Sequence, residues 1–315
     1  EIDMAPDFQR KGDLWTPDKQ SRLIESMLIK LPLPAFYFDG TEDEKWLVVD
    51  GLQRLSAIKN FVVDENLRLQ GLEFLENING KTFSELPRNY RRMIEETEIV
   101  AYIINPGTPA DVKFNIFKRI NTGGLVLEPQ EIRHALNQGI PSKFVANLAQ
   151  LNSFKEATQN VIATDRMLDR EFVTRFLAFY LNGPKEYKPD LDTFMTSSMG
   201  QLNTKTNDEL EKIQLAFDKA MKLSKIIFGK WAFRKVYSIG ERRKPINKAL
   251  FEVWSVELAN LTLEEQKRAV SRKKSIFQEF TKLMNTDDTF VAAITSATGD
   301  KGRAVSYTHL RAHET

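Results

Sequence analysis

The run Asp50-Gly51-Leu52-Gln53-Arg54 has the residue types of a phosphate-binding corner. The apolar stretch before it is typical of a short strand, and apolar residues recur at helical spacing from Leu52 onwards. The run therefore lies at a predicted turn from strand to helix, where unpaired N–H groups and the helix dipole favour an anion. Gly51 lets the backbone approach a ligand closely, and the Arg54 guanidinium can bind two phosphate oxygens.

The same run also has a purely structural interpretation. Asp50 can cap the helix, Gly51 can form the turn, and Arg54 can be solvated or paired with a carboxylate. Asp50 repels a phosphate unless a Mg²⁺ ion binds both the carboxylate and the phosphate. Spacing alone leaves the two interpretations about equally favoured.

A second candidate is the segment 117–124 (FKRINTGG), which is followed by Glu131-Ile132-Arg133. Asn121 and the glycines after it are typical of a helix C-terminus. Without further information, Glu131 and Arg133 are best interpreted as ordinary surface charge.

Basic residues gather in the second half of the chain, and Trp231, Phe233 and Tyr237 lie between those of the first group. They are Lys230, Arg234, Lys235, Arg242, Arg243, Lys244 and Lys248, followed by Lys267, Arg268, Arg272, Lys273 and Lys274. Such cations and rings would suit a nucleic acid, by neutralising phosphates and stacking bases. Solvated helix faces with core aromatic residues are the favoured alternative, because 45 Lys and Arg nearly balance 43 Asp and Glu.

One part of this basic group, Gly240-Glu241-Arg242-Arg243, resembles the phosphate-binding box of ParB proteins. Because no predicted strand precedes it, we expect a basic loop there.

The composition excludes several kinds of chemistry. The chain has no cysteine, which rules out disulfides, thiolate metal sites and a cysteine nucleophile. Its apolar share of 42% is typical of a globular protein, and no apolar run is long enough for a membrane helix. We therefore expect a cytoplasmic protein with no membrane partner.

The last residues, 305–315 (VSYTHLRAHET), match the translation of a sequencing adaptor, so we expect an artefact there and a lost native C-terminus. The chain also begins at Glu1, which favours a fragment. With two of the three histidines in this tail, His134 alone remains elsewhere, too few for a histidine-dependent nuclease centre.

Short apolar runs typical of strands and apolar residues at helical spacing predict the elements that position these residues. Short strands are predicted at 35–38 and 46–49, a hairpin-like stretch at 66–80 and a buried strand at 98–104. Helices are predicted over 16–31, from 52, from 109 to 120, from 129, and over 166–181, 207–228, 245–260 and 262–285. The pattern predicts an α+β fold, mixed in its first part and mainly helical after it.

Taken together, several segments resemble the N-terminal domain family of GmrSD-type restriction endonucleases. They are PDFQR at 6–10 with Trp15, LIES at 23–26, PLP at 32–34, VVDGLQRLSAI at 48–58, GLEF at 71–74, NGKTFSELP at 79–87, FKRINTGGLVLEPQEIR at 117–133 and DREFVTRFLAFY at 169–180. The resemblance implies a ParB/sulfiredoxin-like nucleotide-binding domain over 1–140 and a helical domain over 141–304.

The resemblance also implies a function: a sensor or regulatory module that binds and hydrolyses a nucleoside triphosphate in restriction-type defence against phage. Asp50, Gln53 and Arg54 would then be catalytic, with Asp50 holding Mg²⁺. The residues that would bind the nucleotide are Arg10, Gly51, Arg54, Arg119 and Asn121. Cleavage of DNA would need a separate or lost HNH-type nuclease.

One departure from the family pattern bears on hydrolysis. The family motif is Asp-Gly-Gln-Gln-Arg, and Leu52 replaces the first Gln. An apolar side chain neither orients water nor contacts phosphate, so nucleotide binding is favoured over a Mg²⁺-dependent triphosphatase activity. The alternative function is a non-catalytic ParB-like module that binds DNA.

Overall fold

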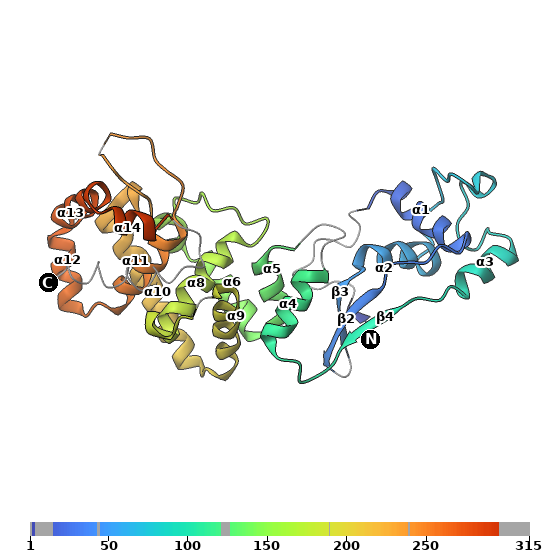
Figure 1. Ribbon diagram of the computed structural model, residues 1–315, viewed down its shortest axis with the longest axis horizontal. Helices are drawn as coiled ribbons and strands as arrows, with labels where there is room; N and C mark the ends of the chain where they lie inside the picture. The colour runs from blue at the N-terminus through green and yellow to red at the C-terminus, as the bar shows by residue number, and fades with distance from the viewer. Residues whose placement is uncertain are drawn as a thin grey trace. The chain divides into compact units, whose positions relative to one another are not determined.

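The computed structural model describes residues 2–3, 15–42, 45–120, 127–188, 190–238 and 240–295. The chain divides into two compact units, Glu1–Leu127 and Glu128–Thr315 (Figure 1). The first unit combines a sheet with helices and the second is helical, so the predicted α+β class is confirmed. The predicted tail at 305–315 lies outside the described residues.

The first unit is built on a four-stranded sheet with the order β1-β3-β2-β4. Its strands and α-helices are β1 (Ile2–Asp3), α1 (Pro17–Leu28), β2 (Phe36–Glu42), β3 (Lys45–Asp50), α2 (Leu52–Ile58), α3 (Arg88–Glu95), β4 (Ala101–Ile104) and α4 (Ala110–Ile120). Strands β2 and β3 are antiparallel, whereas β1 runs parallel to β3 and β4 parallel to β2. The predicted strands at 35–38 and 46–49 are confirmed as β2 and β3.

One face of this sheet packs against α2. Phe36 and Phe38 of β2 and Val48 of β3 form a buried apolar cluster with Leu52, the first residue of α2. A neighbouring cluster joins α1 to Phe61, which lies in the π-helical turn Lys59–Val63 that continues α2. These two cores fix the place of the turn between β3 and α2.

The hairpin-like stretch predicted at 66–80 is closed at its ends by backbone hydrogen bonds, from the Leu69 N–H to the Lys81 carbonyl and from the Gly80 N–H to the Leu69 carbonyl, but it forms no strands. This segment has no strand among its described residues and contains only a short 3-10 turn, Glu76–Ile78. The carboxylate of Glu25 on α1 accepts hydrogen bonds from three consecutive N–H groups, those of residues 73–75, at 2.8–3.1 Å. Those N–H groups are therefore not available to a partner strand.

The predicted strand at 98–104 is present only as β4, and it is not buried. It lies at the edge of the sheet, and Tyr102 is 55% exposed. Tyr102 stacks on Tyr37 of β2, with ring centroids 5.2 Å apart. An apolar run predicts a strand, but it does not tell an edge strand from a central one.

Helix α4 is attached to the sheet by a buried ion pair. Lys113 Nζ lies 3.3 Å from each carboxylate oxygen of Asp39 on β2, and it also donates to the hydroxyl of Thr41. Both charged residues are buried, so the pair fixes α4 relative to β2.

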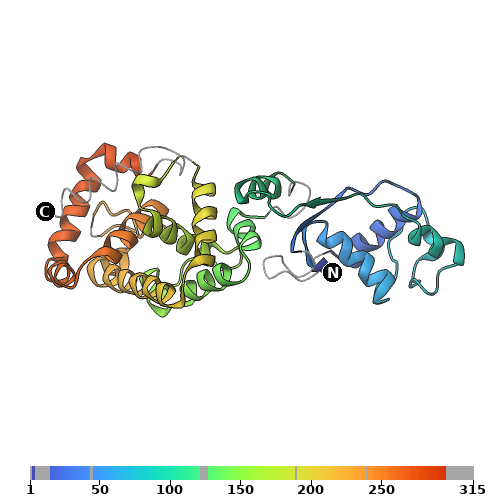
Figure 2. The ribbon, with the colours of Figure 1, turned by 90° about the horizontal axis from the view of Figure 1, so that it is seen from below.

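The second unit consists of helices around one aromatic core. Its α-helices are α5 (Pro129–Leu136), α6 (Ile140–Gln150), α7 (Asn152–Ala157), α8 (Leu168–Asn182), α9 (Leu191–Gln201), α10 (Asn207–Phe228), α11 (Lys248–Asn260), α12 (Leu263–Ser271), α13 (Lys273–Thr286) and α14 (Asp288–Ala293). Figures 1 and 2 show them from two sides. Phe154, Phe176, Phe217 and Phe251 of α7, α8, α10 and α11 pack their rings together in this core.

In this unit the sequence predicts the ends of a helix correctly where capping residues mark both of them. Helix α10 has the predicted bounds, because Thr206 and Glu209 form a capping box and Gly229 follows the last residue. The single helix predicted over 262–285 is two helices, α12 and α13, which meet at Arg272. None of the described helices is long and apolar enough to cross a membrane.

Candidate functional site

The turn between β3 and α2 requires a glycine. Gly51 has a φ of 103°, in the left-handed region, and occupies the N-cap position of α2. A Cβ atom at this position would lie 2.5 Å from Cδ1 of Phe36, closer than real contacts allow. Gly51 also has no side chain to cap the first-turn N–H groups of α2. The turn thus has the backbone geometry that the sequence predicts for a phosphate-binding corner.

Arg54 points into the protein and binds the backbone that leads into β2. Its guanidinium donates to the carbonyl oxygens of Pro34 and Ala35, the latter at 3.1 Å. It also donates to Oδ2 of Asp50 at 2.7 Å and lies 4.5 Å from the ring centroid of Phe36. With an exposed fraction of 8%, Arg54 is buried, and its contacts join β3 and α2 to the backbone before β2.

Asp50 is the more accessible partner of this ion pair. Its side chain is 33% exposed, against 10% for Arg54. The contact with Arg54 uses Oδ2, and Oδ1 is the second carboxylate oxygen at the corner. Asp50 can therefore hold Arg54 in place and still present an oxygen to a cation.

Gln53 fixes the chain just before α1. Its Oε1 accepts a hydrogen bond from the backbone N–H of Trp15 at 3.1 Å. The carbonyl of Trp15 accepts from Gln20, and the side chain of Gln20 accepts from Asn60. Sequence reasoning missed this role for Gln53, because nothing in the spacing connects residues 15, 20 and 60.

The structure thus brings Asp50, Gly51, Gln53 and Arg54 together at one turn. Arg119 is exposed near the end of α4. Arg10 and Asn121 lie outside the described residues, within 4–14 and 121–126. The catalytic and nucleotide-binding roles of these residues stay predictions.

The comparison with family models gives one match in the first part of the chain. Residues 1–137 match the model described as the GmrSD restriction endonuclease, N-terminal domain. This region belongs to the GmrSD N-terminal domain family. The coarse functional assignment follows, namely a module of a restriction-type defence system. No curated protein and no solved structure matches the chain, so the ParB/sulfiredoxin likeness stays a prediction.

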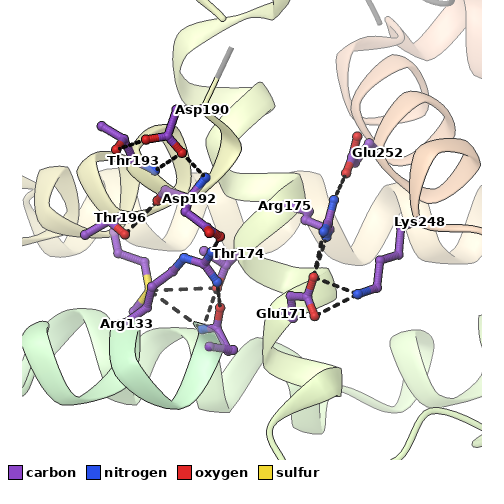
Figure 3. A network of polar contacts seen from close by, with 12 residues as sticks. Arg133, Glu171, Thr174, Arg175, Asp190, Asp192, Thr193, Thr196, Lys248 and Glu252 are labelled. Atoms are coloured by element: carbon purple, nitrogen blue, oxygen red, sulfur yellow. Dashed lines mark hydrogen bonds and ion pairs between the residues drawn. The ribbon is translucent and has the colours of Figure 1, made fainter. Parts of the chain in front are cut away.

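The GmrSD match includes α5, the helix that carries Glu131 and Arg133. Both side chains are buried, so their interpretation as surface charge is wrong. Arg133 donates to Asp192 of α9 (Figure 3). Glu131 accepts from Arg166 at 2.7 Å and from the N–H of Glu128. Burial lowers the pKa of Arg133 to about 10, although Asp192 acts in the opposite direction.

Beyond the GmrSD region, a second buried network joins α8 to α11. Arg175 donates to Glu171 Oε1 at 2.6 Å and to the buried carboxylate of Glu252, and Lys248 lies 2.9 Å from Glu171 (Figure 3). Burial lowers the pKa of Arg175, but the two carboxylates raise it by more. Lys248, which the sequence groups with the basic cluster, therefore serves this network.

Proposed function

We propose that the first unit binds a nucleoside triphosphate at the corner Asp50–Arg54 and acts as a regulatory module of its defence system. The observation that carries the proposal is the turn itself, a glycine N-cap with φ of 103° at the start of α2. N–H groups at a helix N-terminus bind phosphate oxygens, and α2 continues into the Lys59–Val63 turn, which lengthens the helical backbone behind them.

The interior contacts of Arg54 and Gln53 favour binding over hydrolysis. A triphosphatase needs a group that stabilises charge on the transferring phosphoryl and a group that positions water. Arg54 is bound to the carbonyls of Pro34 and Ala35, and Gln53 accepts from Trp15. Leu52 is buried in the sheet–helix core. We therefore propose that the nucleotide is retained as a signal rather than rapidly hydrolysed.

Asp50 fits the role of a Mg²⁺ ligand. Proteins commonly bind Mg²⁺ through one or two carboxylates together with substrate phosphates. Asp50 supplies one such carboxylate at the corner, partly exposed and held in place by Arg54 through a single oxygen. The ion would offset the charge of Asp50 against the phosphates. Arg119 would supply an exposed cation.

Calorimetric titration of the full chain with ATP, GTP, CTP and UTP in the presence of Mg²⁺ tests the proposal. We expect at least one nucleotide to bind, and Asp50→Asn to weaken that binding about 10- to 100-fold through loss of a charge-assisted contact. Removing Mg²⁺ with a chelator is expected to have a similar effect on the wild-type protein. Phosphate release, measured in parallel, is expected to be slow.

Asp64→Asn is the matched control for this variant, because Asp64 is also 33% exposed and is paired with Lys59. It should bind nucleotide like the wild-type protein. If none of the four nucleotides binds, or if Asp50→Asn and Asp64→Asn bind equally well, the proposal is wrong.

A further inference from the structure

Backbone contacts join the two ends of the loop that precedes α11. Arg234 and Ile246 form an antiparallel bridge, and the N–H of Asn247 donates to the carbonyl of Phe233 at 2.8 Å. In Figure 1 the loop is the orange trace that leaves the helices of the second unit and returns to α11. We call the described residues of this stretch, 234–238 and 240–246, the basic loop. The prediction of a basic loop at Gly240-Glu241-Arg242-Arg243 is confirmed.

Several contacts hold the basic loop in a defined conformation. The carboxylate of Glu241 accepts hydrogen bonds from the N–H groups of Tyr237 at 2.5 Å and Ser238 at 3.4 Å. Asn285 of α13 donates to the carbonyl of Tyr237 at 2.9 Å, and Lys235 donates to Thr295 at 2.5 Å. A ligand would therefore meet a surface that is already ordered, which lowers the entropy cost of binding.

The charge of the loop is strongly unbalanced. The side chains in it that are charged at neutral pH are the cations Arg234, Lys235, Arg242, Arg243 and Lys244 and the single carboxylate Glu241. Oε1 of Glu241 accepts hydrogen bonds from two backbone N–H groups, and its Oε2 lies 3.4 Å from Nζ of Lys244.

The cations of the loop repel one another. Burial lowers the pKa of Arg234, and Arg243 lowers it further. Burial also lowers the pKa of Lys235, and the charge of Lys244 lowers it further. A polyanion would relieve this repulsion between like charges.

The aromatic residues of this region do not form a stacking surface. Trp231 and Phe233 are buried in the core of the unit, as the favoured interpretation of core aromatic residues predicts. Tyr237 is half-buried and is covered by Lys244, whose Nζ lies 3.8 Å from the ring centroid. By contrast, Arg242 and Arg243 are exposed, although Arg243 also donates to Gln159. This arrangement suits phosphates and not unstacked bases.

We propose that the basic loop binds the phosphate backbone of duplex DNA without contacting bases. Charge complementarity selects a polyanion, and the burial of Trp231 and Phe233 selects a duplex over a single strand. This inference concerns the second unit and does not depend on nucleotide binding by the first.

Fluorescence anisotropy with the full chain and a short labelled duplex, at several salt concentrations and without nucleotide, tests this proposal. The logarithm of the affinity should fall linearly with the logarithm of the salt concentration. The double variant Arg242→Ala/Arg243→Ala removes two phosphate contacts. Its slope should be smaller by about 2, and its affinity about 60-fold lower at about 0.1 M salt.

Lys185→Ala/Lys188→Ala is the matched control, because it removes two exposed cations from another loop of the same unit. It should bind DNA like the wild-type protein, and all variants should unfold at the same temperature. The proposal is overturned if the wild-type protein does not bind the duplex or if the arginine variant binds like the control. It is also overturned if single-stranded DNA or polyglutamate binds more tightly than the duplex.

Discussion

Arg175→Met is expected to lower the free energy of unfolding of the second unit by about 3–5 kcal/mol. The substitution removes the guanidinium that donates to the carboxylate of Glu252, whose side chain is 2% exposed (Figure 3). A buried charge that loses its partner costs far more than a surface pair contributes, because water cannot solvate it. Urea denaturation followed by circular dichroism measures the change.

The double variant Arg175→Met/Glu252→Gln is the decisive comparison. Because it removes the stranded charge as well, it should recover a large part of the lost stability. Lys222→Met, which breaks an exposed ion pair with Asp218 in α10, should change stability by less than about 1 kcal/mol. An Arg175→Met protein as stable as Lys222→Met would contradict this account of the network.

Glu25→Gln is expected to destabilise the first unit by about 2–4 kcal/mol, because three backbone N–H groups lose a charged acceptor. The buried carboxylate of Glu25 accepts three backbone hydrogen bonds, and an amide would turn an NH₂ group toward N–H donors. We expect a lower melting temperature and faster proteolysis within 66–80. Glu73→Gln removes an exposed carboxylate that is paired with Arg22 and should change little, so equal effects of the two variants would contradict this role.

The same contacts predict how stability depends on pH. Burial raises the pKa of Glu25, but the three backbone hydrogen bonds and Arg22 lower it by more, so it lies below the usual 4.5. The stabilisation is therefore complete above the pKa of the unfolded chain and is lost as the pH falls through the lower pKa of the folded state. Glu25→Gln should remove this part of the acid sensitivity.

The sequence alone predicts those features of the structure that depend on residues close together along the chain. The capping box at Thr206 and the glycine at 229 set both ends of α10. The turn at Gly51 also follows from local signals, because a glycine between a strand and a helix satisfies a local backbone requirement.

The orientation of the functional side chains depends instead on contacts between residues that are far apart in the sequence. Spacing allows Arg54 to face either a ligand or the protein, and the carbonyls of Pro34 and Ala35, about twenty residues earlier, determine the inward orientation. Likewise, the buried side chain of Arg133 donates to Asp192, which lies 59 residues further along the chain. No periodic pattern contains such pairs, so the sequence predicts the position of the corner better than the roles of its side chains.

Hydrogen–deuterium exchange of residues 50–54, with and without nucleotide and Mg²⁺, is the most direct test of the proposed nucleotide site. If phosphates bind the N–H groups at the start of α2, exchange there should slow on addition of the nucleotide, and Asp50→Asn should need a higher nucleotide concentration for the same effect. Nucleotide binding that leaves exchange at these residues unchanged would contradict the site proposed here.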